Sequence, residues 1–326
     1  MSDFRTTFPI PESDKKISLS SRLLSVGSCF SDTVGKKLSE SRFSILANPY
    51  GTLFSPPSIS KLLMGSIDLS EPDPDGFVRN NGIWYHYDFH GSLSHTDRDT
   101  LKHELESVHQ RVNEKLRSAD WLIITWGTAF VYERTDHHGT VANCHKIRAD
   151  SFRKQLLSTQ KIIGDFENLL ADLLTFNPSL NIILTVSPVR HRKDTLPLNT
   201  VSKSSLRLAS HHLEQQHERV RYFPAYEILL DDLRDYRFYA DDLLHPSEVA
   251  VSYIWEKFAS VYIDLQGQEF IRRWKKLRTA MDHRPFHPGS EAHRSFLAET
   301  IKELEDINSI VDVSVEIEHL RNQLTS

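Results

Sequence analysis

Two short stretches, far apart in the chain, carry side chains suited to acyl transfer. Ser28 and Cys29 lie in the first, LLSVGSCFSDTVGKKL, where Gly27 ends an apolar run and an amphipathic pattern resumes at Phe30. This order predicts a strand, a tight turn and a helix that starts at the two nucleophilic side chains. A helix N-terminus stabilises negative charge, which favours a thiolate or alkoxide. A buried cysteine that only packs is the alternative, and this stretch alone favours neither.

The second stretch, YADDLLHPSEV, places Asp242 three residues before His245, just ahead of a predicted helix. At this spacing the carboxylate can accept the imidazole N–H and fix its tautomer. The other ring nitrogen is then free to take a proton from a nucleophile. The alternative is that Asp242 or Ser247 caps the helix and His245 lies on the surface.

The elements that must position these side chains are predicted from buried apolar runs separated by helical patterns. Such runs are typical of a parallel sheet covered on both faces. The expected strands are 23–26, 43–46, 121–126, 180–186 and 220–223. Ligands of an open α/β sheet bind outside the carboxyl ends of its strands. We therefore expect one shared edge for Ser28, Cys29, Gly51, Gly127, Arg190, His191, Asp242 and His245.

Two excursions interrupt the pattern. Residues 71–95 form an insertion with a hairpin around Asn81-Gly82, and His90 follows it. Residues 130–148 are expected to form a second hairpin around His138-Gly139, followed by Asn143, Cys144 and His145. These polar groups are candidates for substrate contacts, with simple packing as the alternative. Helices are expected at 101–116, 152–174, 204–218 and from 249, and the Pro56-Pro57 segment is expected to be a turn.

Composition restricts the class of protein. The 326 residues carry a formal charge of −5, which gives no broad basic surface for nucleic acid. No apolar run is long enough to span a bilayer or act as a signal sequence, so we expect a cytoplasmic protein without a membrane partner. Its two cysteines, Cys29 and Cys144, are not expected to form a structural disulfide.

The motifs VGSCFS, NPYG, TWGTAFVYE, NCHK, SPVRH and YRFYADDLLHPS resemble those of the GSCFA-domain branch of the SGNH/GDSL hydrolase superfamily. This resemblance implies a three-layer α/β/α, flavodoxin-like parallel sheet over residues 1–262. It also implies hydrolysis of an ester bond, with a small acyl group on a carbohydrate as the first expectation for the substrate. No cofactor and no metal are implied.

The resemblance assigns roles residue by residue. Cys29 occupies the position of the nucleophilic serine and Ser28 that of the preceding aspartate, so Cys29 is the first choice of nucleophile and Ser28 the second. Asp242 and His245 match the acid and the base. Gly51 matches the glycine whose N–H binds the oxyanion.

One oxyanion donor is missing from the pattern. The third block of the superfamily supplies an asparagine after a glycine, but this chain reads Gly127-Thr128-Ala129. Loss of one such donor costs about 10²- to 10³-fold in rate. Either Asn143 or Arg190 replaces it, or the protein hydrolyses esters poorly. His90, His145 and His191 are further candidates for substrate contacts.

Two other functions stay open. The first is a catalytically degenerate fold that binds carbohydrate or another partner. The second is a metal site built from Cys29, Cys144, His145 and His245, although no paired ligand spacing supports it.

Residues 263–326 are expected to form a helical extension. The stripe Leu297, Ile301, Leu304, Asn308, Val311 and Val315 has the spacing of a short coiled-coil seam, and 283–290 joins it to the preceding helix. We expect this extension to pack back on the sheet domain. A homodimer seam in which Asn308 sets the register is the alternative.

Overall fold

A five-stranded parallel sheet forms the centre of the computed structural model, which describes residues 5–137 and 139–325. Its strands are β1 (Arg22–Gly27), β2 (Ser44–Ala47), β5 (Trp121–Trp126), β9 (Asn181–Val186) and β10 (Val220–Phe223). Their order across the sheet is β10-β9-β5-β1-β2. Counted along the chain this is 2-1-3-4-5, the flavodoxin-like order, so the expected fold class is confirmed. The switch point lies between β1 and β5.

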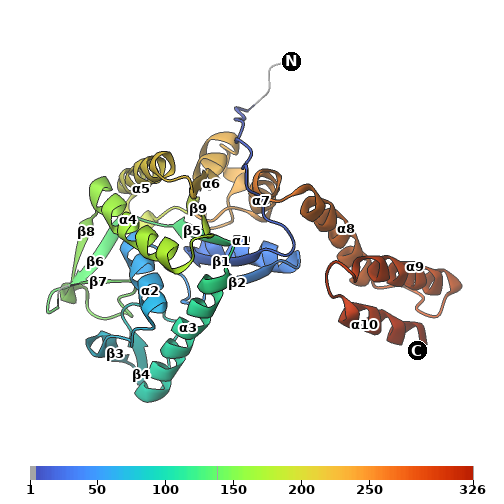
Figure 1. The fold of residues 1–326 in the computed structure, drawn as a ribbon, viewed down its shortest axis with the longest axis horizontal. Coiled ribbons are helices and arrows are strands. Elements are labelled where there is room, and N and C mark those ends of the chain that lie inside the picture. Colours follow the sequence, from blue (N-terminus) through green and yellow to red (C-terminus); the bar gives the residue numbers. More distant parts are fainter. Residues whose placement is uncertain (1–4, 138, 326) are drawn as a thin grey trace.

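Helices cover both faces of the sheet and make three layers (Figure 1). Successive strand residues alternate between the layers: Leu24 packs in one apolar cluster and Leu23 in the other. The first cluster contains α2 (Pro56–Asp68), α3 (Arg98–Ser118), α4 (Thr159–Phe176) and α5 (Leu196–Gln216). The second contains α1 (Cys29–Glu40), α6 (Ala225–Glu227) and α7 (Glu248–Tyr262). Burial on both faces explains why the central strands β5 and β9 are mostly apolar in sequence.

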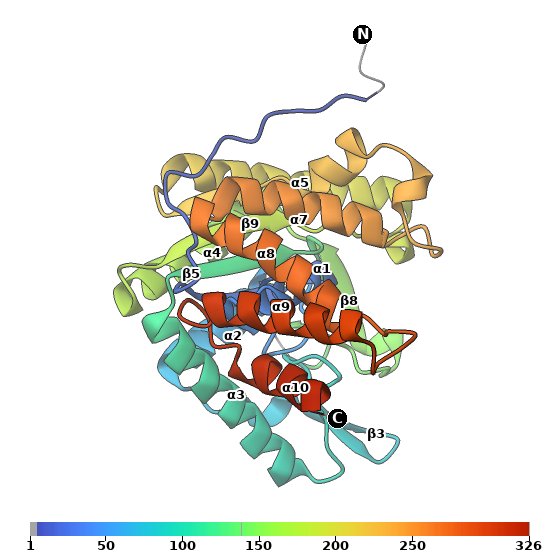
Figure 2. The same ribbon diagram turned by 90° about the vertical axis from the view of Figure 1, so that its right-hand side faces the viewer.

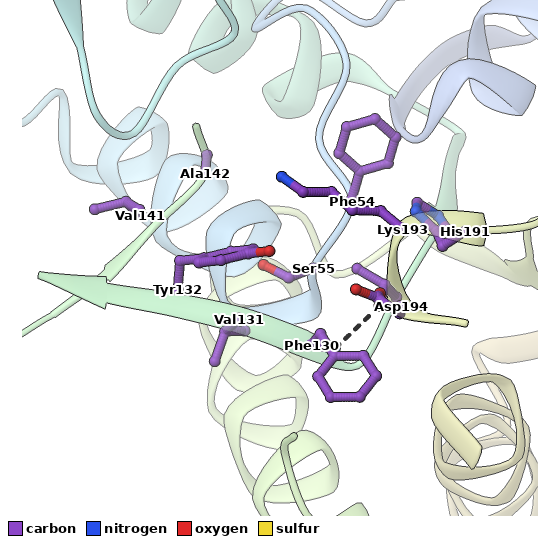
Figure 3. Close-up of a pocket in the computed structure, with 11 residues that line it drawn as sticks. Phe54, Ser55, Phe130, Val131, Tyr132, Val141, Ala142, His191, Lys193 and Asp194 are labelled. Atoms are coloured by element: carbon purple, nitrogen blue, oxygen red, sulfur yellow. Dashed lines mark hydrogen bonds between the residues drawn. The ribbon is translucent and has the colours of Figure 1, made fainter. Parts of the chain in front are cut away.

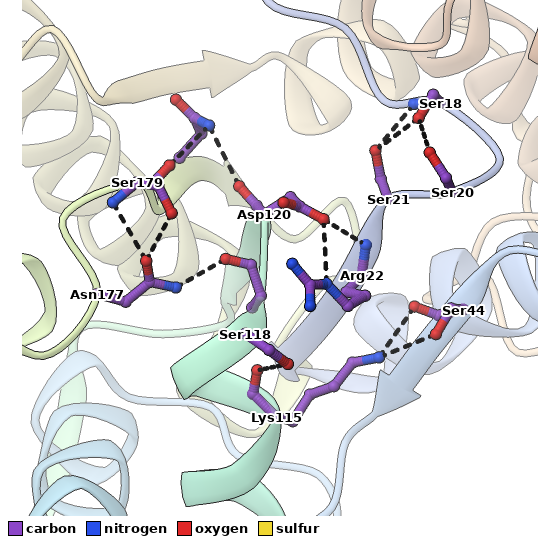
Figure 4. A network of polar contacts seen from close by, with 12 residues as sticks. Ser18, Ser20, Ser21, Arg22, Ser44, Lys115, Ser118, Asp120, Asn177 and Ser179 are labelled. Atoms are coloured by element: carbon purple, nitrogen blue, oxygen red, sulfur yellow. Dashed lines mark hydrogen bonds and ion pairs between the residues drawn. The ribbon is translucent and has the colours of Figure 1, made fainter.

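The amino-terminal edge of the sheet is closed by a polar network (Figure 4). Asp120 bridges β1 and β9: its carboxylate accepts the Arg22 N–H at 2.7 Å, and its backbone oxygen accepts the Asn181 N–H at 3.0 Å. Nearby, the Asn177 amide donates to the carbonyls of Leu116 and Ala119, both at 2.8 Å. At this edge the polar side chains are bonded to backbone groups. The candidate site residues follow the strands at the opposite, carboxyl edge.

Both expected excursions are present as small antiparallel sheets. The first pairs β3 (Phe77–Asn80) with β4 (Ile83–His86), around the expected turn. The second has three strands, β6 (Phe130–Arg134), β7 (Thr140–Val141) and β8 (Phe152–Leu156). His138, in its expected turn, lies outside the described residues. Short 3₁₀ or π turns span Pro74–Gly76, Ala149–Ser151, Arg192–Asp194, Ile228–Asp232 and Tyr236–Phe238.

Three of the expected boundaries are wrong. The helix expected at 152–174 begins only at Thr159, because 152–156 pairs with β6 and Ser158 then caps the helix. Pro56 and Pro57 do not form a turn: they occupy the first turn of α2, where a missing N–H costs nothing. The helix expected from residue 204 starts at Leu196, next to Pro197.

The C-terminal helices are α8 (Leu265–Met281), α9 (Glu291–Ile307) and α10 (Ser314–Thr325), which share an apolar cluster of their own. They lie to one side of the sheet domain and face the viewer in Figure 2. The Trp274 indole donates to the Glu40 carbonyl at 2.7 Å, and Arg278 pairs with the Glu40 carboxylate at 3.3 Å. This helical part therefore contacts the end of α1.

The continuous seam expected through Val315 is wrong. Helix α9 ends at Ile307, and the Asn308 side chain accepts the Val313 N–H at 2.9 Å in the turn that follows. Val315, on α10, is 78% exposed. Separately, none of the helices in the described part of the chain is both long and apolar enough to cross a bilayer.

Candidate active site

Cys29 is the first residue of α1, directly after β1. Gly27 makes this turn possible: its φ is +139°, and a Cβ there would lie 2.2 Å from the Thr125 carbonyl of β5. Ser28 is buried, and its hydroxyl accepts the Phe30 N–H at 3.3 Å as the helix N-cap. Cys29 is only partly buried. Of the two adjacent candidates, Ser28 is therefore engaged in capping and Cys29 is the more accessible.

The surroundings of Cys29 disfavour its thiolate on balance. Burial raises the pKa of the Cys29 thiol, and the nearby Asp32 carboxylate raises it further, while Lys203 lowers it. Asp32 also anchors the loop after β2, since it accepts hydrogen bonds from the Asn48 amide at 2.7 Å and the Thr52 hydroxyl at 3.2 Å. The resting cysteine is thus a thiol that needs a base.

Asp242 and His245 form the expected pair. Nδ1 of His245 lies 2.6 Å from Oδ2 of Asp242, and Oδ1 accepts the N–H groups of Leu244 and His245 at 2.8 and 3.0 Å. These hydrogen bonds lower the pKa of Asp242 to about 2, the backbone N–H of His245 contributing most. An ionised carboxylate only accepts, so in the neutral ring the proton is on Nδ1 and Nε2 keeps its lone pair.

The loop after β9 lies beside this pair. The Arg190 N–H donates to the Leu244 carbonyl at 3.2 Å, and its guanidinium donates to the Tyr239 hydroxyl at 2.6 Å. Arg190 therefore holds the 239–245 loop against the sheet and does not point freely into the site as a substitute oxyanion donor. Burial lowers the pKa of the adjacent His191 to about 4, and its electrostatic neighbours include both Lys203 and His245.

A buried polar stripe on α5 holds the two central loops, and the sequence reasoning missed it. Asn199 accepts the His191 N–H at 2.9 Å, and the Ser202 hydroxyl accepts the Ala129 N–H at 2.7 Å. Lys203, 1% exposed, donates to the Gly127 and Ser187 carbonyls, both at 2.7 Å. The available signal was polar residues at 199, 202 and 203 in register with the apolar positions 206, 209 and 213.

Two hollows meet at His191 and Lys193. One, of about 180 Å³, lies between the loop after β2, strand β6 and the loop after β9, and Figure 3 shows Tyr132 and Val141 opposite His191 and Lys193. The other, wider and of about 780 Å³, is lined by residues 190–193 and 241–244 and so adjoins the Asp242–His245 pair. Together they offer an aromatic pocket beside a polar mouth. Neither includes Cys29 in its wall.

The expected oxyanion glycines are already engaged. The Gly51 N–H donates to the Asn48 carbonyl at 2.8 Å, and the Gly127 N–H donates to the Phe54 carbonyl at 2.7 Å. Neither glycine offers a free donor in this structure, which for Gly51 is contrary to the role that the resemblance assigns. The Cys29 N–H opens α1 and has no acceptor among the described residues. It is the available oxyanion donor.

Three further candidates belong to the excursions. His145 is buried, bonds the His86 carbonyl through Nε2 at 2.8 Å and stacks on Tyr85. Asn143 accepts the His145 N–H at 2.9 Å and so holds the turn from which His145 reaches the β3–β4 hairpin. His90 packs against Gly51, where a Cβ would lie 2.4 Å from that of His90. None of the three contacts Cys29 or His245 within the described residues.

The proposed metal ligands do not converge. Within residues 5–137 and 139–325 no three His, Cys, Asp or Glu side chains are placed to share an ion, and both cysteines are free thiols. His145 is turned into the hairpin and His245 is bound to Asp242. The metal site considered from sequence is therefore not formed. Cys29 and His245 share the carboxyl edge but make no direct hydrogen bond in the described structure.

Models of known sequence families identify the family to which the chain belongs. The sequence model of the GSCFA family matches residues 22–258, and that of the GSCFA C-terminal domain matches residues 274–326. The chain belongs to the GSCFA family. The GSCFA match spans β1 to α7 and so includes Cys29, Asp242 and His245. No curated protein matches the GSCFA chain at a significant level.

Solved structures show only distant likeness to this GSCFA protein. A protein from Streptococcus pneumonia named after platelet activating factor has 12% identity and a TM-score of 0.37, covering 73% of this chain and 83% of its own. A carbohydrate esterase family 3 protein from Talaromyces cellulolyticus has 9% identity and a TM-score of 0.35, covering 78% and 99%. Because both scores are low, the fold is assigned from the strand order of the GSCFA chain itself.

Proposed function

We propose that this GSCFA protein is an esterase-type hydrolase that removes a small acyl group, with carbohydrate esters as the first substrate class. The observation that carries the proposal is the Asp242–His245 pair, in which Nδ1 is bound to the carboxylate and Nε2 of the neutral ring can accept a proton. A base oriented by an acid and a nucleophile at a helix N-terminus are the parts that acyl transfer needs.

In the proposed cycle Cys29 Sγ attacks the ester carbonyl while its proton passes to Nε2 of His245. The Cys29 N–H and the α1 dipole stabilise the oxyanion. Collapse breaks the bond to the alcohol oxygen, which takes the proton back from His245, and leaves a thioester on Cys29. Water, deprotonated by His245, then attacks the thioester, and the acid and the free thiol are released.

No hydrogen bond joins Cys29 to His245 among the described residues. Catalytic hydrogen bonds in ligand-free enzymes are often long and tighten in the complex. The half-exposed 240–247 loop adjoins the wide hollow, so a substrate bound there would lie beside the His245 base. Ser28 stays the second choice of nucleophile, against which its burial and its capping bond count.

The test is a hydrolysis screen of wild type and His245→Ala against acetylated sugars and short aryl esters, with His211→Ala, an exposed histidine of α5, as control. The proposal expects turnover that His245→Ala loses and His211→Ala keeps. Turnover that survives in His245→Ala contradicts it.

A second candidate is a degenerate fold that binds carbohydrate without turnover. It is favoured by the engaged N–H groups of Gly51 and Gly127 and by the raised pKa of the Cys29 thiol. Glycan binding by wild type without hydrolysis of any ester in the screen would support this candidate.

A further inference from the structure

Lys203 is a buried amine that the cycle above does not use. It lies on α5, is 1% exposed, and forms no ion pair with a carboxylate among the described residues. Burying an unpaired ammonium is costly, and two carbonyl acceptors could be satisfied by a neutral donor. A lysine at this position is therefore suited to a partner that becomes negative.

The strand register places Lys203 at the nucleophile. Gly27 pairs with Thr125, and Ser28 donates to the Thr125 carbonyl at 3.0 Å, so Cys29 and Gly127 continue neighbouring strands from paired residues. Nζ of Lys203 bonds the Gly127 carbonyl on that path and the Ser187 carbonyl at the end of β9. An ammonium group has three hydrogens, and within the described residues the third has no acceptor.

The ionisable groups around Lys203 leave Cys29 as its anionic partner. They come from three elements: Cys29 of α1, His191 after β9, and Tyr226 of α6, whose ring centroid lies 5.8 Å from Nζ. His191 has its pKa lowered and Tyr226 has its pKa raised, both mainly by burial, so both are neutral near pH 7. Burial also lowers the pKa of Lys203 to about 7, which Cys29 opposes.

We propose that Lys203 is the positioning residue of this site: its ammonium group fixes the carboxyl ends of β5 and β9 around Cys29 and stabilises the Cys29 thiolate as it forms. The inference rests on the proposed function for its catalytic meaning. Its physical content, a charge that favours the thiolate, holds whether or not an ester is hydrolysed.

The test measures the rate of iodoacetamide alkylation at pH 6.5 in a Cys144→Ser background, where Cys29 is the remaining cysteine. Because the pKa of Lys203 is lowered to about 7, its amine is largely charged at this pH. Lys203→Met removes that charge and is expected to slow alkylation about tenfold. Lys203→Arg keeps the charge and is expected to keep the rate. Ser202→Ala loosens the same loop without a change in charge, and its rate should match wild type.

A purely structural role predicts otherwise. If the alkylation rate at pH 6.5 is unchanged in folded Lys203→Met, or if Ser202→Ala slows it equally, the proposal is wrong. If Lys203→Met shows no cooperative thermal transition, Lys203→Gln takes its place, because its amide can still donate to both carbonyls, and the same slowing is required. The readout needs no substrate, so a failure of the esterase proposal in the hydrolysis screen is separate from a failure here.

Discussion

Nδ1 of His245 lies 2.6 Å from Oδ2 of Asp242, and both residues sit in a turn in which that carboxylate also accepts two backbone N–H groups. The turn and the pair therefore stabilise one another. Since the pair fixes the proton on Nδ1, the orientation and tautomer of His245 are set before any substrate binds.

Asp242→Asn should abolish the preference of the His245 ring proton for Nδ1. An amide N–H in place of Oδ2 donates toward Nδ1 and moves the ring proton to Nε2, so the base is lost while the shape of the site remains. We expect kcat for ester hydrolysis to fall about 10²- to 10⁴-fold with little change in KM. Steady-state kinetics check this, with Asp172→Asn, an exposed aspartate of α4, as control. An unchanged kcat in Asp242→Asn would show that Asp242 does not orient His245 for catalysis.

The activity of wild type should rise with pH through the neutral range. Burial, and then Asp32, raise the pKa of Cys29 above its ordinary value, so the thiolate fraction at neutral pH is small and grows as pH increases. Asp32→Asn removes one raising charge at nearly constant shape. Its kcat/KM profile and its alkylation profile should both move to lower pH. A shift to higher pH, or none, contradicts the assigned influence of Asp32.

Gly27→Ala should destabilise the fold itself. The new Cβ meets the Thr125 carbonyl at 2.2 Å, at a φ of +139° that side chains rarely adopt. Strain and overpacking together suggest a loss of about 2–4 kcal/mol in the free energy of unfolding. Gly164→Ala on α4 is the matched control, because its Cβ meets nothing within 4 Å, and a gain of about 0.4–1 kcal/mol is expected there. Urea unfolding compares the two, and equal stabilities would exclude the close approach.

Tyr132→Ala tests the aromatic pocket. Its ring lines the 180 Å³ hollow but forms none of the described hydrogen bonds at Cys29 or His245. Truncation should therefore raise KM about tenfold for the preferred ester and leave kcat nearly unchanged, the pattern of lost uniform binding. Phe286→Ala, with a side chain 99% exposed, is the control for a lost aromatic ring. If both KM and kcat were unchanged in Tyr132→Ala, the substrate would bind outside this hollow.

Local patterns predicted the parts of this fold that depend on neighbours in sequence. Unbroken apolar runs identified the five sheet strands, and the three-residue spacing of Asp242 and His245 predicted a pair that forms within one turn. Their common edge followed from the general behaviour of parallel sheets. The strand order itself came from the family resemblance, since periodicity carries no information on which strands are adjacent.

The features that sequence reasoning missed depend on contacts between distant segments. The predicted helix began at residue 204, because the apolar spacing is regular only beyond that point, and so it left out Lys203. The groups that Lys203 binds, the Gly127 and Ser187 carbonyls, lie on two other loops. The N–H of Gly51 is hydrogen-bonded to the Asn48 carbonyl of its own turn, and only the backbone conformation shows this. The break after Asn308 carries no proline or glycine, so the apolar spacing continued through it unnoticed.

The most direct measurement of the central claim is mass spectrometry of peptides from protein quenched during turnover of an aryl acetate. The account predicts an acetyl group on the peptide that contains Cys29, removable by hydroxylamine, present in wild type and absent in Cys29→Ala. Accumulation of that adduct should be much slower in His245→Ala. An acetyl group on Ser28 with Cys29 intact, or full turnover by Cys29→Ala, would contradict the account.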